Sequence, residues 1–138
     1  MPATANSIVT PQSVKSGTAA AITANATYSD TPTNTVVLIT AGANGSRVVK
    51  ISAVARATVT ATELQLYRDG DGTGTVKRLF NSKLMAAYTV AGTTGNTPTD
   101  FGYSDTNPLI LGPGEKVYAA IGVTLAAGIA FAAEWQDY

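Results

Sequence analysis

Short apolar or alternating segments recur along the chain, and clusters rich in Gly, Pro, Asn and Asp separate them. In the segment ELQLY the alternation is regular, so Leu64 and Leu66 share one face of an extended chain and polar residues occupy the other. Strands are expected over residues 35–40, 46–59, 63–67, 75–82, 109–111, 117–125 and 128–138, after an edge strand in the N-terminal region. About eight short strands at regular spacing, without an amphipathic helix, predict an all-β antiparallel sandwich or barrel.

Two segments leave more than one interpretation open. Residues 83–90 contain Ala, Leu and Met, which favour a helix, between ends that favour a strand, so a strand or one helical turn fits. Residues 91–108 form the longest predicted loop, and this loop carries Phe101 and Tyr103. Aromatic side chains in such a loop either plug the nearest core or make exposed contacts, and we expect plugs.

The most apolar segment, residues 117–133, is near the lower length limit of a transmembrane helix. It is dominated by Ala and Gly, and Glu134 follows it directly. Read with a period of two, Val117 and Ile121 lie on one face before the sequence AAG, and Phe131 and Trp135 continue the pattern after it. The alternation therefore predicts a β-hairpin, with Trp135 as a core side chain of the last strand.

The N-terminal region is small, polar and rich in Thr, with prolines at positions 2, 11 and 32. Because it has little apolar surface to bury, residues 1–16 are expected to form an extended arm, and residues 17–138 a single β-sandwich domain. Ile8, Val9 and Val14 can dock this arm on the body or on a neighbouring molecule. Residues 1–10 lack the basic and apolar regions of a secretory signal.

The composition of the chain excludes several classes of functional site. The chain has 138 residues, enough for one domain, and contains no Cys and no His. It therefore lacks disulfides, thiolate metal sites and the usual general base at neutral pH. Nine basic and nine acidic side chains cancel without a basic cluster, so neither nucleic acid nor a membrane is an expected partner. The low charged fraction of 13% favours surfaces covered by another copy or another protein.

The stretch YRDGDGTGTVKR resembles a ligand-binding loop more than any other part of the chain. In an EF-hand register, Asp69, Asp71 and Thr73 take the first three ligand positions, but the twelfth position, a bidentate Glu in that motif, is Phe80. A phosphate-binding loop fails too, since no Gly-Lys-Ser/Thr follows the glycines. We expect a β-hairpin in which glycines adopt positive φ and aspartates bond the local backbone. A weak calcium contact through Asp69 and Asp71 is the alternative.

No other combination of residues predicts catalysis. Glu134 and Asp137 are three residues apart, so on a strand they face opposite sides and cannot act as a glycosidase pair. The neighbours Ser82 and Lys83 diverge on a strand, and nothing marks a nucleophile elbow. We therefore expect no enzyme activity, no catalytic residue and no cofactor.

Three segments together resemble a known family: the opening MPATANSIVTPQSVKSGTAA, the hairpin ATELQLYRDGDGTGTVKRLFNSKLM and the ending NPLILGPGEKVYAAIGVTLAAGIAFAAEWQDY. The chain is similar to head decoration, or cement, proteins of tailed bacteriophages. The resemblance covers most of the chain and rests on texture and segment order. It implies a jelly-roll-like sandwich, made in the host cytoplasm, that binds the major capsid protein on the outer capsid surface, often as trimers.

The resemblance carries over no catalytic residue. It makes the arm the expected interface with the capsid or with adjacent subunits, through Pro2, Ile8, Val9, Pro11 and Val14. An extended arm can bury main-chain and apolar surface along a neighbour, as strand addition does. The alternative is a fibre- or spike-associated β-sandwich of the same virion that binds a receptor, with carbohydrate as a candidate ligand.

Overall fold

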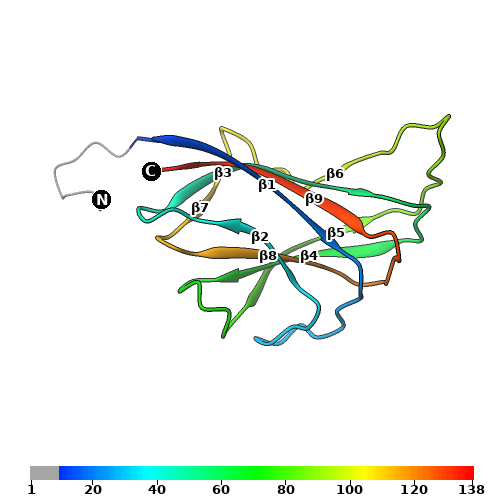
Figure 1. Ribbon diagram of the computed structural model, residues 1–138, viewed down its shortest axis with the longest axis horizontal. Coiled ribbons are helices and arrows are strands. Elements are labelled where there is room, and N and C mark those ends of the chain that lie inside the picture. The colour runs from blue at the N-terminus through cyan, green and yellow to red at the C-terminus, as the bar shows by residue number, and fades with distance from the viewer. Residues whose placement is uncertain (1–9) are drawn as a thin grey trace.

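Two antiparallel β-sheets packed face to face make up the protein in the computed structural model (Figure 1). The structure describes residues 10–138, and no helix occurs among them. The nine strands are β1 (Ser13–Ala21), β2 (Val36–Thr40), β3 (Ser46–Ala55), β4 (Thr62–Asp69), β5 (Arg78–Met85), β6 (Thr99–Asp100), β7 (Leu109–Leu111), β8 (Lys116–Ile121) and β9 (Ile129–Asp137). The predicted all-β antiparallel sandwich is confirmed. The additional strand, β6, lies within the segment expected to be a loop.

The order of strands is that of a jelly roll. Sheet A runs β1-β9-β3, with both β6 and β7 paired to the far edge of β3, and sheet B runs β2-β8-β4-β5. The pairs β1–β9, β2–β8, β3–β6/β7 and β4–β5 are nested, as in one antiparallel ribbon folded over on itself. Rolling that ribbon adds the pairs β3–β9 and β4–β8, which close each sheet.

The hairpin predicted for residues 117–133 is wrong in its pairing. Both halves are strands, but β8 lies in sheet B between β2 and β4, and β9 lies in sheet A between β1 and β3 (Figure 1). Residues 122–128 therefore cross from one sheet to the other. Alternation shows that a segment is extended and which side chains share a face, but it carries no information about the partner strand. Residues 10–138 contain no helix long and apolar enough to cross a membrane.

The other predictions for loops and turns can be compared directly. The segment YRDGDGTGTVKR joins the antiparallel neighbours β4 and β5, so the predicted hairpin is confirmed. Residues 83–85 complete β5, and Tyr88 forms an isolated bridge with Val59, so the undecided segment is extended. Phe101 is a buried plug in the core, as expected, and Tyr103 packs partly buried against the core.

The core lies between the two sheets and is built from the inward faces of the strands. Its largest fully buried side chains include Ile51, Phe131 and Leu64. Trp135 also belongs to this core, which confirms its interpretation as a structural tryptophan. A Cβ atom on Gly17 would lie 2.9 Å from the Leu38 carbonyl oxygen and 3.0 Å from the Trp135 ring, so only Gly lets β1 approach this closely.

The outer faces of the two sheets differ. Residues 22–35 fold over the outer face of sheet B, where the Asn25 N–H donates to the Ile121 carbonyl at 2.8 Å. Beneath this loop lies a second, small cluster of buried side chains, Tyr67, Tyr118 and Ala120. The central strands β4 and β8 of sheet B are therefore buried on both faces, and the outer face of sheet A has no such cover among the described residues.

Candidate binding surface

The predicted arm continues directly into the first strand. Pro2, Ile8 and Val9 lie outside the described residues, and Pro11 and Val14 are exposed, Val14 to 82%. Strand β1 begins at Ser13, inside the range expected for the arm, and pairs with β9 from Ser13 onward.

The ladder begins one residue before β1, since the Gln12 N–H donates to the Asp137 carbonyl at 2.7 Å. The structure thus places the C-terminal end of the arm, from Gln12 onward, at an edge of sheet A, beside the C-terminus (Figure 1).

The middle of the outer face of sheet A carries mainly short side chains, with Lys50 and Glu134 among them. Ser16 and Thr18 of β1 lie opposite Glu134 and Ala132 of β9, and Ser52 of β3 follows in the same row as Ala132. These residues border a shallow hollow of 190 Å³. The short side chains suit contact with another protein surface, because little side-chain entropy is lost when they are ordered on binding.

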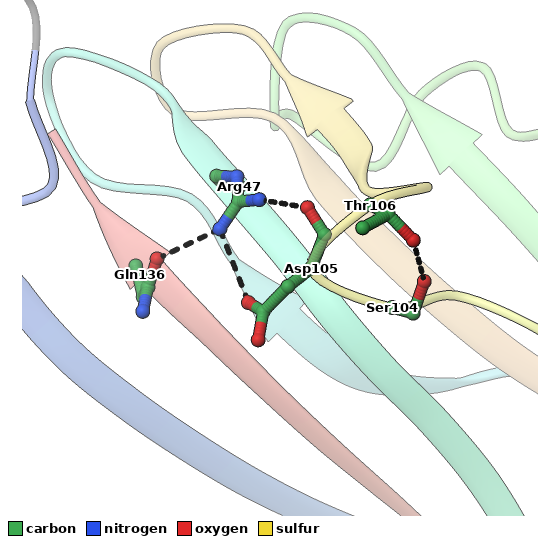
Figure 2. Close-up of polar contacts among 5 residues, drawn as sticks. All are labelled: Arg47, Ser104, Asp105, Thr106 and Gln136. Atoms are coloured by element: carbon green, nitrogen blue, oxygen red, sulfur yellow. Dashed lines mark hydrogen bonds and ion pairs between the residues drawn. The ribbon is translucent and has the colours of Figure 1, made fainter.

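One corner of this face is held by the arginine cluster shown in Figure 2. Arg47 of β3 donates through Nη1 to Asp105 Oδ1 at 3.3 Å and to Gln136 Oε1 at 3.2 Å. Its Nη2 donates to the Asp105 carbonyl oxygen. The cluster fastens the turn closed by the Ser104–Asn107 bridge onto β3 and β9. Because the guanidinium of Arg47 finds its hydrogen-bond partners within the molecule, we assign Arg47 a structural role.

The hairpin tip brings Asp69 and Asp71 into one turn, as the sequence indicated. Asp69 is 1% exposed, and its carboxylate accepts the N–H of Gly72 at 3.2 Å and the N–H of Gly74. Asp71 Oδ1 accepts from the Thr73 N–H at 3.0 Å and the Thr73 hydroxyl at 2.8 Å. The Thr73 N–H is the main cause that lowers the pKa of Asp71. The two carboxylates therefore bond the turn, as predicted for a hairpin.

The flank of the tip carries two cations with defined partners. Arg68 Nη2 lies 2.5 Å from Glu115 Oε1, and Lys77 Nζ lies 4.3 Å from the centre of the Tyr118 ring. Burial, followed by the nearby charges of Asp69 and Asp71, raises the pKa of Tyr118. Within residues 10–138, no three His, Cys, Asp or Glu side chains gather in a way that could hold a metal ion.

A groove that the sequence did not indicate lies on the opposite side of the sandwich from β1. It has a volume of 530 Å³ and runs between the free edge of β5 in sheet B and the free edge of β6 in sheet A. Lys83, Leu84 and Tyr88 form one wall, and Pro98 and Asp100 belong to the other. No local pattern in the sequence marks this groove, because its two walls come from different segments. These are residues 83–90 and 91–108, whose patterns left more than one interpretation open.

The sequence also did not predict the buried polar cluster that lies under residues 22–35, the loop over sheet B. The Asn25 amide donates to Gln65 Oε1 and to the Tyr67 hydroxyl, both at 2.8 Å, and its Oδ1 accepts the Thr33 N–H at 3.0 Å. The alternation in β4 places Gln65 and Tyr67 on the outward face, where exposure is the ordinary expectation. The cluster is fully hydrogen-bonded, which is typical of a structural latch.

Comparisons with protein-family models, with curated proteins and with solved structures found no match.

Proposed function

We propose that this protein is a virion structural protein that decorates and stabilises the outer surface of a phage capsid. The observation that carries the proposal is the edge position of β1, whose exposed first half continues into the proline-containing arm with its apolar side chains Ile8 and Val9. An edge strand that leads into such a segment is suited to strand addition on a neighbouring protein. The proposal gives the arm the role of fixing the protein to the capsid or to adjacent copies.

The exposed outer face of sheet A supports the same function. It carries Ser, Thr and Ala side chains beside Lys50 and Glu134, and the loop over sheet B leaves it open for contact. A lattice of repeated capsid subunits offers a partner for such a face. The jelly-roll order of the strands agrees with the fold that the sequence resemblance implies.

The test compares capsid binding by the full chain with binding by a protein that begins at Ser13, the first residue of β1. This cut removes residues 1–12 of the arm and keeps every strand, so the melting temperature of the shortened protein should stay within a few degrees. Binding to empty capsids should fall well below full occupancy. Full occupancy by the shortened protein would contradict the assigned role of the arm.

A fibre- or spike-associated module of the same virion is the alternative, and copy number separates it from decoration. A decoration protein occupies the shell in hundreds of copies, whereas a fibre component occurs a few times at the tail or at one vertex. Quantitative gel analysis of the native particle, together with a low-resolution image, decides between the two. A location restricted to the tail would overturn the decoration proposal.

A further inference from the structure

The groove between β5 and β6 is bounded by two strand edges that have no partner among the described residues. Strand β5 pairs only with β4, and the two-residue β6 pairs only with β3. Such edges present unpaired N–H and C=O groups and are templates for another extended chain. Leu84 is 66% exposed at this edge, so an apolar side chain is available beside the free backbone groups.

Hydrogen bonds tie both walls of the groove to the body of the protein. Tyr88 exchanges two backbone hydrogen bonds with Val59, at 3.0 and 3.1 Å, and its hydroxyl accepts the Ala55 N–H at 2.8 Å. The Asn96 amide ties the other wall to the Ala55 carbonyl at 3.2 Å. A preformed groove of this kind loses little conformational entropy when a segment enters it.

The N-terminal segment of the same chain has the chemistry of a fitting occupant. Residues 1–12 contain no charged side chain, so no charge has to leave water when they bind. Pro2 and Pro11 cannot donate a backbone hydrogen bond, but residues 3–10 between them are free of proline. Ile8 and Val9 supply β-branched apolar side chains within this stretch.

Chain length keeps Ile8 and Val9 out of the groove of their own molecule. The pairing registers place Asp100, at the near rim of the groove, level with Thr18 of β1 and three strands away from it. The distance from Ser13 to this rim is about 22 Å, using the usual strand rise and spacing. Ile8 is five residues before Ser13 and reaches at most about 18 Å. Where Ile8 and Val9 fill the groove, they therefore come from a second copy.

We propose that the groove between β5 and β6 receives the N-terminal segment of a second copy of this chain. Donor and acceptor lie on opposite sides of the sandwich, since β1 ends sheet A on one side and β6 ends it on the other. The contact is therefore heterologous, and it closes into a ring when the rotation between neighbours allows it. A ring of three accords with the trimer that the family resemblance implies.

The inference names a partner for the arm and so deepens the proposed function, but its test needs no capsid. The chain has no cysteine, so introduced thiols report a single contact. Protein carrying Ile8→Cys is mixed with protein carrying Leu84→Cys under mild oxidation, and we expect a disulfide-linked pair. Val123→Cys in place of Leu84→Cys is the matched control, because Val123 is also exposed, at 44%, and lies outside the groove.

The double variant Ile8→Cys/Leu84→Cys then reports closure of the ring. We expect a covalent species of fixed size, with a mass of three chains. Equal linkage to Val123→Cys, absence of linkage, or only an internally linked monomer would overturn the proposal.

A second measurement uses no thiols. Sedimentation of the full chain should show an oligomer. Leu84→Lys should raise the concentration needed for assembly by roughly tenfold or more, since a charge replaces an apolar side chain at the contact. Val123→Lys should leave assembly unchanged. A monomeric full chain, or an oligomer indifferent to Leu84→Lys, contradicts the proposal, and capsid binding can still be measured separately.

Discussion

At the residue scale, Asn25 is the most consequential polar side chain of the structure. It is fully buried, and its amide joins the loop over sheet B to two outward-facing side chains of β4, Gln65 and Tyr67. Its Oδ1 accepts two backbone N–H groups of its own loop, those of Thr27 and Thr33. A single side chain thereby satisfies polar groups that the loop would otherwise bury unpaired.

We predict that Asn25→Ala lowers the free energy of unfolding by about 2–3 kcal/mol, because several buried donors and acceptors lose their partner at once. Asn96→Ala is the control, since Asn96 is exposed and donates to one carbonyl. It should cost less than about 1 kcal/mol. Urea denaturation of both variants measures the difference, and equal losses would remove the latch role from Asn25.

The buried Tyr67 hydroxyl should make the stability of the fold depend on pH in the alkaline range. Its burial raises the pKa of the Tyr67 hydroxyl above the ordinary value of 10.0. The folded protein therefore keeps this proton at pH values where the unfolded chain releases it. The stabilisation is complete below the unfolded pKa and is lost as the pH rises through the folded pKa.

We expect the melting temperature to fall above about pH 10, the usual tyrosine pKa, and the fall to be shallower in Tyr67→Phe, which has no proton to lose there. The variant should be less stable than the parent near neutral pH, since Asn25 loses an acceptor. Melting curves between neutral and strongly alkaline pH measure both effects. An identical alkaline slope in parent and variant would show that other groups dominate.

At the element scale, the β4–β5 hairpin is defined by its tip. Gly72 adopts a φ of +71°, and a Cβ atom there would lie 2.4 Å from the Gly114 carbonyl oxygen. The tip thus packs against the turn that precedes β8, and the buried Asp69 holds it from within. The Gly/Asp composition that first resembled a ligand loop is explained by backbone conformation and close packing.

We predict that Gly72→Ala destabilises the protein by about 1–3 kcal/mol, through positive φ and through overlap with a backbone oxygen. Gly92→Ala is the control, because open space surrounds Gly92 and its φ is ordinary. This substitution should be neutral or slightly stabilising. Chemical denaturation compares the two, and equal stabilities would argue against a tightly packed tip.

Calcium should have little effect on the hairpin. Asp69 and Asp71 already accept hydrogen bonds from the turn, so a cation would have to displace them. A ligand at about 100 times its Kd adds roughly 2.7 kcal/mol and raises the melting temperature of such a domain by several degrees. We expect millimolar calcium, compared with EDTA, to shift the melt by less than about one degree. A larger shift would support calcium binding by Asp69 and Asp71.

At the scale of the whole molecule, nearly every strand pairs with one that is distant in sequence. Among the described strands, β4–β5 is the one pair of neighbours in sequence, and the first and last strands lie side by side. This nesting places the arm on one side of the sandwich and the free groove on the other. The proposed ring needs a donor on one side of the molecule and an acceptor on the other, and the jelly-roll topology provides both.

The same topology predicts slow folding. Most pairings require closure of long loops before any contact forms, so we expect a main refolding phase in the millisecond to second range. Stopped-flow fluorescence of Trp135, which is buried in the core and is the one tryptophan of the chain, reports this phase. A main phase faster than a millisecond would contradict a transition state that depends on distant pairing.

The sequence by itself determined the all-β class, the approximate positions of the strands, the β4–β5 hairpin and the inward position of Trp135. These features depend on local alternation and on turn residues, which are read from neighbours in the chain. Tertiary structure alone decided that β8 and β9 belong to different sheets, that a loop covers Gln65 and Tyr67, and that Leu84 faces a groove. Strand partners and loop cover are set by contacts between distant segments, and alternation along one strand is the same whichever neighbour it acquires.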